Sequence, residues 1–309
     1  SAGYDISLLP GRGIARAFTL ANVGAVIENV RAIGRAFGIL RRLRPQVVVG
    51  VGGFASVPCV IAAFLLRIPM VVHEQNAAPG VANRLAVFLG AQAAIAWPGT
   101  PLRRAVVTGN PVRPDILACV RDPKGAHLVI MGGSLGARRI NDAALACYDR
   151  WRNRTDLTVT HITGIRNFDD CDARLKAARR DDDALSFELV AFESDMAARY
   201  ADTSLVVGRA GAVTVAELAA VGMPAILVPL PNAPGDHQGA NARALARVGA
   251  AIIVPDAECN GARLGTEVDA LLADSERLTE MSRAAASVAQ PQAASALAAL
   301  VREKMRRAR

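Results

Sequence analysis

Short apolar runs recur along the whole chain and alternate with segments whose apolar residues have helical spacing. Uniformly apolar runs are typical of parallel strands that helices cover on both faces. Strands that alternate with helices indicate βαβ units, so the pattern predicts an α/β fold with parallel sheets. The predicted strands are Val47–Val51, Met70–His73, Ala93–Ala96, Ala105–Thr108, His127–Met131, Thr158–Ile162, Phe187–Ala191, Ser204–Val207 and Ala225–Val228.

Two of these runs end in glycine-rich turns, VVVGVGGFAS and LVIMGGSLGAR. The repetition predicts two similar doubly wound domains, each with its own loop at the carboxyl end of a strand. Two prolines in GNPVRPDIL, residues 109–117, disfavour a continuous helix and place the domain boundary there. We expect residues 1–112 to form the first domain and residues 113–292 the second, with residues 293–309 returning to the first.

Composition narrows the class of protein. Apolar residues make up 52% of the chain and charged residues 21%, which predicts a sizeable core. Five scattered cysteines without a C-x-x-C pair fit a reducing cytosol better than a disulfide framework or a zinc site. The charge-free stretch 46–66 contains three glycines and a proline, so it predicts strand, loop and short helix rather than a membrane span. Residues 1–10 lack the basic start and apolar centre of a signal peptide.

Positive charge is concentrated near the start of the chain, which has a formal net charge of +8. A basic helical segment with an apolar face favours contact with an anionic membrane surface. A helix that packs on the core and exposes its basic face explains the same pattern. Nucleic acid is disfavoured, because aromatic residues are only 4% and no recognition motif is present. The arginines between Gly11 and Pro45 are Arg12, Arg16, Arg31, Arg35, Arg41, Arg42 and Arg44, against the single acid Glu28.

The turn GGSLGARRIN has the composition of an anion-binding loop. Gly132, Gly133 and Gly136 allow backbone amides to approach a ligand, and the helix start that follows favours an anion. Ser134 can donate its hydroxyl to a phosphate. The turn is neither G-x-G-x-x-G nor a Walker loop, so NAD and ATP lose support. A merely structural turn remains the alternative.

A second strand, loop and helix occur in LVVGRAGAVTVAELAA, residues 205–220. Thr214 and Glu217 fit a capping box, in which both side chains satisfy amides at the start of a helix. In the functional interpretation, Glu217 binds ribose hydroxyls, as acidic residues do in dinucleotide domains. Arg209 and the amides of residues 211–213 would then face a phosphate or a base. Spacing alone does not separate these interpretations.

Polar side chains also follow two other strands. Residues 73–76, His-Glu-Gln-Asn, end one strand, where open α/β sheets bind ligands, and we favour a functional role for them. Residues 229–245 also follow a strand, and their polar side chains could hydrogen-bond the hydroxyls of a sugar. The alternative is a polar loop that caps a helix. The polar residues of that loop are Asp236, His237, Gln238 and Asn241.

Taken in order, seven stretches resemble the bacterial enzyme family that transfers N-acetylglucosamine from UDP-N-acetylglucosamine to lipid I, the undecaprenyl-linked muramoyl-pentapeptide, to form lipid II in peptidoglycan synthesis. The resemblance covers nearly the whole chain, and the ordered set is far more specific than any single motif. The stretches are GRGIARA, VVVGVGGFASVP, VVHEQNAAPGVANRLA, VVTGNPVRPDIL, MGGSLGARRIND, FESDMAARYADTSLVVGRAGAVTVAELAAVGMPAILVPLP and DHQGANARAL.

The resemblance implies a GT-B fold of two Rossmann-like domains. The second domain would hold the donor, with Glu217 on the ribose and Ser134 of the glycine-rich loop, beside Gly133, on the diphosphate. Gly52 and Gly53 would belong to the acceptor-side loop. The residues implied around the nucleotide are Arg113, Phe192, Glu193, Arg209, Gly211, Ala212, Val213 and Thr214. Those implied for N-acetylglucosamine are Asn76, His237 and Gln238.

The sequence departs from this family in one respect. The family begins with an extra strand and a G-G-T-G-G-H loop whose histidine is the favoured general base, and this motif does not occur in the 309 residues. We therefore expect the first strand–helix–strand to be absent and the first sheet incomplete, with a fragment of a longer polypeptide as the simplest explanation. The general base is left unassigned, with His73 and Glu74 as weak candidates. Neither a metal ion nor a cofactor is implied.

The resemblance predicts a peripheral enzyme at the cytoplasmic face of the cell membrane. Its partners would be UDP-N-acetylglucosamine, lipid I and an anionic lipid surface. Two alternatives are another GT-B transferase that moves a sugar from UDP to a lipid, and a non-catalytic chain that binds a nucleotide sugar. A dehydrogenase is least compatible with the sequence, because the dinucleotide fingerprint is absent.

Overall fold

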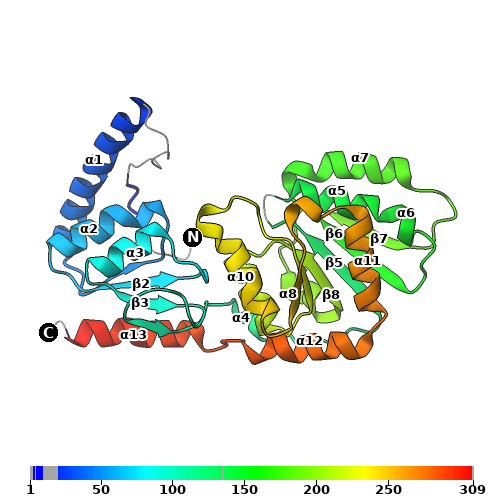
Figure 1. Ribbon diagram of the computed structural model, residues 1–309. Helices are drawn as coiled ribbons and strands as arrows, with labels where there is room; N and C mark the ends of the chain where they lie inside the picture. Colours follow the sequence, from blue (N-terminus) through cyan, green and yellow to red (C-terminus); the bar gives the residue numbers. More distant parts are fainter. Residues whose placement is uncertain (1–2, 4, 10–19, 134–135, 308–309) are drawn as a thin grey trace. The chain divides into compact units, whose positions relative to one another are not determined.

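The computed structural model describes residue 3 and the ranges 5–9, 20–133 and 136–307. The chain forms two compact units. Figure 1 labels their elements and colours the chain along its sequence. Unit 1 contains Ser1–Gly109 and Ala294–Arg309, and unit 2 contains Asn110–Ala293. Among the described residues, no helix is both long enough and apolar enough to cross a bilayer.

Unit 1 is built on a parallel sheet with the strand order β1-β2-β3-β4. The stretch 46–66 forms a strand, a turn and a helix of nine residues, as its glycines and proline predict. The elements are α1 (Leu20–Leu43), β1 (Val48–Gly50), η1 (Phe54–Ser56), α2 (Val57–Leu65), β2 (Met70–Glu74), α3 (Val81–Phe88), β3 (Gln92–Ile95), β4 (Ala105–Val107) and α13 (Ala293–Arg307).

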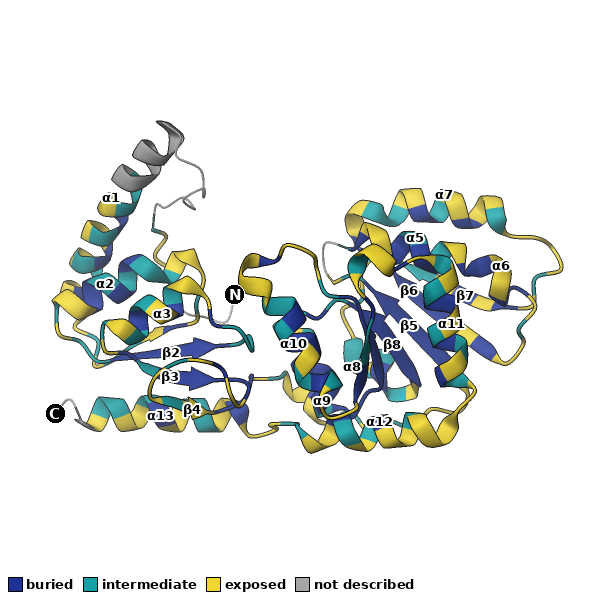
Figure 2. Cartoon of the chain, viewed as in Figure 1, coloured by how far each residue is buried: buried dark blue, intermediate teal, exposed yellow. Residues whose placement is uncertain are grey.

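Helices cover both faces of this sheet. Successive residues of a strand point to opposite faces, so neighbouring residues of β2 pack against different helices. Val72 packs in a core cluster with Ala36 of α1 and Val60 of α2. Val71, its neighbour in β2, instead packs with Leu300 of α13 on the other face. Figure 2 shows β2 and β3 as buried strands between these layers.

The described part of α1 packs on the core. Ala32, Ala36 and Leu40 are buried, whereas Arg31 and Arg35 are exposed. This part therefore agrees with the interpretation of a core-packed helix with a solvated basic face. Arg12 and Arg16 lie outside the described residues.

Unit 2 contains a six-stranded parallel sheet with the order β10-β9-β8-β5-β6-β7. The chain proceeds outward from β5 to β7 on one side and from β8 to β10 on the other, so the strand order reverses between β5 and β8. The elements are α4 (Pro114–Leu117), β5 (Ala126–Met131), α5 (Arg138–Ala146), α6 (Tyr148–Trp151), β6 (Leu157–Ile162), η2 (Ile165–Asn167), α7 (Phe168–Ala178), β7 (Ser186–Val190), α8 (Met196–Asp202), β8 (Leu205–Gly208), α9 (Ala212–Ala220), β9 (Ala225–Leu227), η3 (Pro234–Asp236), α10 (His237–Ala246), β10 (Ala251–Ile253), η4 (Asp256–Glu258), α11 (Gly261–Leu272) and α12 (Ser275–Ser287).

The predicted parallel α/β architecture is confirmed, and each predicted strand overlaps an observed one. Strand β10 was missed. It is only three residues long, and pairing with β9 at the edge of the sheet defines it. A run this short carries too little periodicity to be separated from a loop in the sequence.

Candidate functional site

The site lies where the strand order of unit 2 reverses, because open α/β sheets bind ligands beyond the carboxyl ends of the strands at this point. The glycine-rich turn follows β5 there, and the 209–211 turn follows β8. The backbone of Gly133 has a φ of +83° and that of Gly136 a φ of +76°. A Cβ on Gly136 would lie 2.1 Å from the carbonyl oxygen of Thr163, so this position requires glycine. Ser134 lies outside the described residues.

The start of helix α9 tests whether Thr214 and Glu217 form a capping box. The helix begins after Gly211, whose extended backbone makes it the N-cap residue. Thr214 is therefore the third residue of the helix and does not cap it, so the capping-box interpretation is wrong. The helix therefore begins three residues earlier than the Thr-x-x-Glu pattern suggests.

A cavity of about 170 Å³ collects several of the residues that the sequence singled out. Gly133, Phe192, Glu193, Thr214 and Glu217 all line it. The sequence did not indicate the other lining residues, because apolar residues and a tyrosine inside apolar elements carry no functional signal by themselves. These are Met131, Ile162, Met196 and Tyr200.

Glu217 is a buried carboxylate with one long ion pair. It is 8% exposed, and the nearest Arg113 nitrogen, Nε, lies 3.9 Å from Oε1. The Tyr200 hydroxyl donates to Oε2 across 3.4 Å. Burial raises the pKa of Glu217, while the charge of Arg113 and the Tyr200 hydrogen bond act to lower it. The carboxylate therefore has one hydrogen bond and one longer ion pair among these contacts, and keeps capacity to accept further hydrogen bonds.

Arg209 does not present a free charge in this structure. Its Nη1 atom donates to Asp256 Oδ1 over 2.6 Å and to the carbonyl oxygen of Val228 over 3.1 Å. Val228 follows β9 and Asp256 follows β10. Arg209 therefore links the loops at the carboxyl ends of these strands to the turn after β8. Its sequence-based assignment to a phosphate or base stays a prediction.

The loop before α10 is folded against the same edge of the sheet. Asn241 is fully buried and donates to the carbonyl oxygen of Ala210, which fixes α10 beside the turn after β8. Gln238 accepts a hydrogen bond from the Leu230 amide over 2.9 Å, and His237 bonds the carbonyl oxygen of Pro234. His237 and Gln238 therefore stand at the start of α10, and their role with a sugar stays a prediction.

The two candidate bases in unit 1 are buried. His73 is 2% exposed, and its Nε2 atom donates to the carbonyl oxygen of Gly109 over 2.9 Å. Burial lowers the pKa of His73. Glu74 is 3% exposed and accepts hydrogen bonds from Asn76, Gly80 and Asn83. Neither side chain offers a proton acceptor at the surface, because each is enclosed and already hydrogen-bonded.

Glu74 instead organises the loop that follows β2. Its Oε1 atom accepts from both the backbone and the side-chain nitrogen of Asn76, and its Oε2 atom accepts from Asn83 over 2.8 Å. Gly52 lies against Asn83, since a Cβ there would be 3.2 Å from Asn83 Nδ2. Gly52 and Gly53 both have positive φ, which explains the glycines of this turn without assigning them a ligand.

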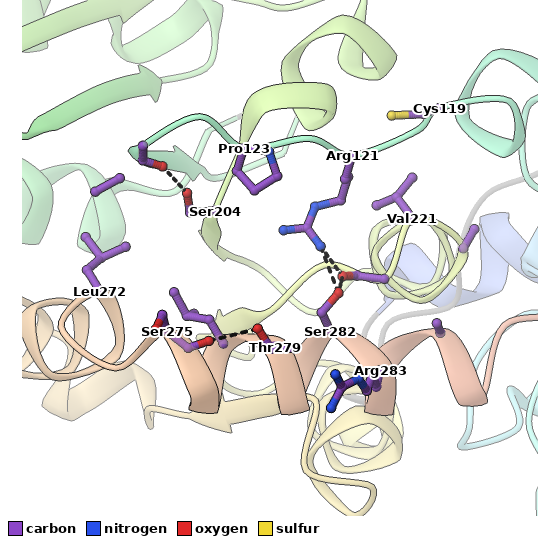
Figure 3. Close-up of a pocket in the computed structure, with 16 residues that line it drawn as sticks. Cys119, Arg121, Pro123, Ser204, Val221, Leu272, Ser275, Thr279, Ser282 and Arg283 are labelled. Carbon is purple, nitrogen blue, oxygen red and sulfur yellow. Dashed lines mark hydrogen bonds between the residues drawn. The ribbon is translucent and has the colours of Figure 1, made fainter.

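A larger cavity, of about 660 Å³, lies at the amino ends of the unit 2 strands, beside the start of β5 (Figure 3). Arg121 points toward Ser282 and the carbonyl oxygen of Gly222, and it also donates to the carbonyl oxygen of Thr203 over 3.0 Å. These carbonyls end α9 and α8, where the helix dipole is negative. Arg121 thus links α8 and α9 to α12, which gives its charge a structural role.

Comparison with known proteins identifies the family of the chain. The glycosyltransferase family 28 N-terminal domain matches residues 1–95, and the family 28 C-terminal domain matches residues 127–297. A UDP-N-acetylglucosamine–N-acetylmuramyl-(pentapeptide) pyrophosphoryl-undecaprenol N-acetylglucosamine transferase from Halothermothrix orenii is 35% identical, covering 97% of this chain and 86% of the relative. The enzyme of that name from Alkalilimnicola ehrlichii is 41% identical over 90% of this chain and 78% of its own.

A solved structure agrees with these relatives. The crystal structure of MurG from Acinetobacter baumannii has a TM-score of 0.75 and 32% sequence identity, and the match covers 97% of this chain and 84% of that one. Two Rossmann-like domains with parallel sheets, matching both family 28 domains, define a glycosyltransferase with the GT-B fold. The chain belongs to the family of UDP-N-acetylglucosamine–N-acetylmuramyl-(pentapeptide) pyrophosphoryl-undecaprenol N-acetylglucosamine transferases. The predicted fold class and family resemblance are confirmed.

Proposed function

We propose that this chain transfers N-acetylglucosamine from UDP-N-acetylglucosamine to lipid I, which yields lipid II and UDP. The observation that carries the proposal is identity of 35–41% to enzymes named for this transfer, over 90% or more of the chain. The cavity around Glu217, at the switch point of a parallel sheet, supports it independently because this is where nucleotides bind in such sheets.

Unit 2 supplies the donor site in this proposal. Glu217 accepts hydrogen bonds from the ribose hydroxyls, and Phe192 and Glu193 lie beside the nucleotide. The loop of Gly133 and Ser134 receives the diphosphate, near the start of α5, while the amides of residues 211–213 open α9. Gln238 and His237 are assigned to the N-acetylglucosaminyl group. Arg113 and Thr214 complete the surroundings of the nucleotide.

The chemistry is an inverting displacement at a sugar. An acceptor hydroxyl attacks the anomeric carbon, the bond from that carbon to the UDP oxygen breaks, and the hydroxyl proton passes to a base. Negative charge that develops on the departing diphosphate is stabilised by backbone amides and the positive end of a helix dipole. We assign the base to neither His73 nor Glu74, because both are buried and hydrogen-bonded.

Acceptor-dependent release of UDP tests the function directly. With UDP-N-acetylglucosamine and a lipid I analogue together, we expect UDP release and a disaccharide product, and UDP-glucose should serve as a much poorer donor. Donor binding without turnover in the presence of the acceptor would instead identify a chain that binds the nucleotide sugar without catalysis. Failure of a folded protein to bind either donor would remove the proposal.

We further propose that unit 1 contacts an anionic lipid surface at the cytoplasmic face of the membrane. Phe88 of α3 is 86% exposed and lines a groove of about 400 Å³ together with Arg84, Arg103 and Arg104. An exposed aromatic ring among arginines suits the headgroup region, where apolar burial and charge attraction act together. The Arg-rich segment 12–44 adds charge to the same unit.

Vesicle sedimentation measures this contact. Binding to vesicles that contain anionic phosphatidylglycerol should weaken as salt is added, because salt screens exposed charges. Phe88→Ser should weaken binding about fivefold, since part of a phenyl group no longer enters the lipid. Val120→Ser is the matched control, because Val120 is a similarly exposed apolar residue of unit 2. Equal binding by both variants would place the contact elsewhere.

A further inference from the structure

Glu217 has two contacts that differ in kind. Arg113 is half-exposed and also lies 3.7 Å from Asp115, so its attraction to Glu217 is shared and screened by solvent. Tyr200 is fully buried, and its hydroxyl donates to Glu217 Oε2. A carboxylate can accept about four hydrogen bonds, so one bond from Tyr200 leaves capacity for a ligand. Tyr200 is therefore the buried partner of the carboxylate.

Helix α8 holds Tyr200 rigidly. Asp195 caps the helix by accepting a hydrogen bond from the Ala198 amide over 3.0 Å. Arg199, the neighbour of Tyr200, pairs with Glu188 over 2.7 Å and with Glu193 over 2.5 Å. Adjacent residues of a helix point in different directions, so Arg199 anchors α8 while Tyr200 lines the cavity. The tyrosine thus reaches Glu217 from a fixed support.

We propose that Tyr200 is a positioning residue that acts through Glu217, holding Oε2 so that the carboxylate stays directed at the ribose hydroxyls of the donor. This inference rests on the proposed function, because it takes the ligand of the cavity to be a nucleoside diphosphate. Tyr200 does not touch the reacting atoms. Its effect is exerted on nucleotide binding.

The arrangement has a consequence for the pH dependence of nucleotide binding. Only an ionised carboxylate accepts hydrogen bonds through both oxygens, so UDP affinity should weaken as pH falls through the pKa of Glu217. Burial and Asp115 raise that pKa, while Arg113 and the Tyr200 hydroxyl act to lower it. Glu193 is the other acid that lines the cavity. Loss of the hydroxyl raises the pKa further, which moves the weakening to higher pH.

Two tyrosine variants of the full chain test the proposal. Tyr200→Phe deletes the hydroxyl at Glu217, and Tyr148→Phe deletes another buried hydroxyl of unit 2, which bonds Asp183 over 2.8 Å. Calorimetric titration with UDP is carried out from neutral to acidic pH. We expect Tyr200→Phe to bind UDP about threefold to tenfold more weakly at neutral pH, with its midpoint at higher pH than that of the wild type. Tyr148→Phe should match the wild type in both respects.

A double variant shows whether Tyr200 acts through the carboxylate. In a Glu217→Ala background, which has no side-chain oxygen for the Tyr200 hydroxyl and does not titrate, Tyr200→Phe should change UDP affinity less than twofold. If Tyr200→Phe alone does not fold, recovery of folding in the double variant supports the coupling, whereas failure of both to fold assigns Tyr200 to packing and overturns the inference. A folded Tyr200→Phe with wild-type affinity at every pH also overturns it. Absence of UDP binding by the wild type would count against the proposed function itself.

Discussion

Replacing Glu217 with alanine should weaken the binding of UDP-N-acetylglucosamine about 100-fold. The carboxylate lies in the cavity at the switch point of the unit 2 sheet, where it would receive two hydrogen bonds from the ribose. Hydrogen bonds to a charged group contribute roughly 1.5–3 kcal/mol each, so losing both costs on the order of 3 kcal/mol. Among the residues of the proposed donor site, Glu217 should therefore have the largest effect on donor binding.

Calorimetric titration of the variant with UDP-N-acetylglucosamine measures this effect, with UDP as a second ligand that shares the ribose. Both ligands should lose affinity to the same extent, because Glu217 is assigned to the nucleotide and not to the sugar. Glu276→Ala is the control, since Glu276 is an exposed acid in the first turn of α12. Unchanged affinity in a folded Glu217→Ala protein would show that the ribose is bound elsewhere.

Unit 2 should lose about 2 kcal/mol of its free energy of unfolding between pH 7 and pH 5 because of His161. His161 is fully buried in β6, and its Nε2 atom bonds Asn141 Oδ1. Burial lowers the pKa of His161 from 6.5, the usual value for histidine, to about 4. In this window the unfolded chain binds a proton that the folded protein does not, so acid favours unfolding.

Urea denaturation of wild type and His161→Gln at the two pH values isolates this contribution. Glutamine does not titrate and can still donate to Asn141, so its stability should fall less between pH 7 and pH 5, by about 2 kcal/mol. A Trp97→Phe background makes Trp151 the fluorescent reporter of unit 2, because these are the two tryptophans of the chain. An equal pH dependence in both proteins would show that His161 is protonated without unfolding.

His161 also connects stability to the donor site. Asn141 donates to the carbonyl oxygen of Thr163 over 3.0 Å, and Thr163 packs directly against Gly136 of the glycine-rich loop. The network therefore supports the backbone that the proposal assigns to the diphosphate.

Much of the fold could be predicted from the sequence, because the signals are local. Parallel strands in a covered sheet are uniformly apolar, so nine runs were recognisable, whereas the three-residue β10 was not. Glycines at positions with positive φ marked the loop after β5, and an acid in the helix after β8 marked Glu217. The start of α9 was mistaken by one turn, because Gly211 supplies the extended N-cap that Thr214 was also suited to provide.

The sequence by itself determined the two α/β domains, the family and the residues proposed around the nucleotide. Only the tertiary structure decided which polar side chains are hydrogen-bonded to other parts of the protein. Arg209 pairs with Asp256, Glu74 bonds Asn83, and Tyr200 reaches Glu217. These partners are separated along the chain and meet only when the strands and helices pack. Their burial and hydrogen bonding arise from that packing, and no local pattern of residues encodes them.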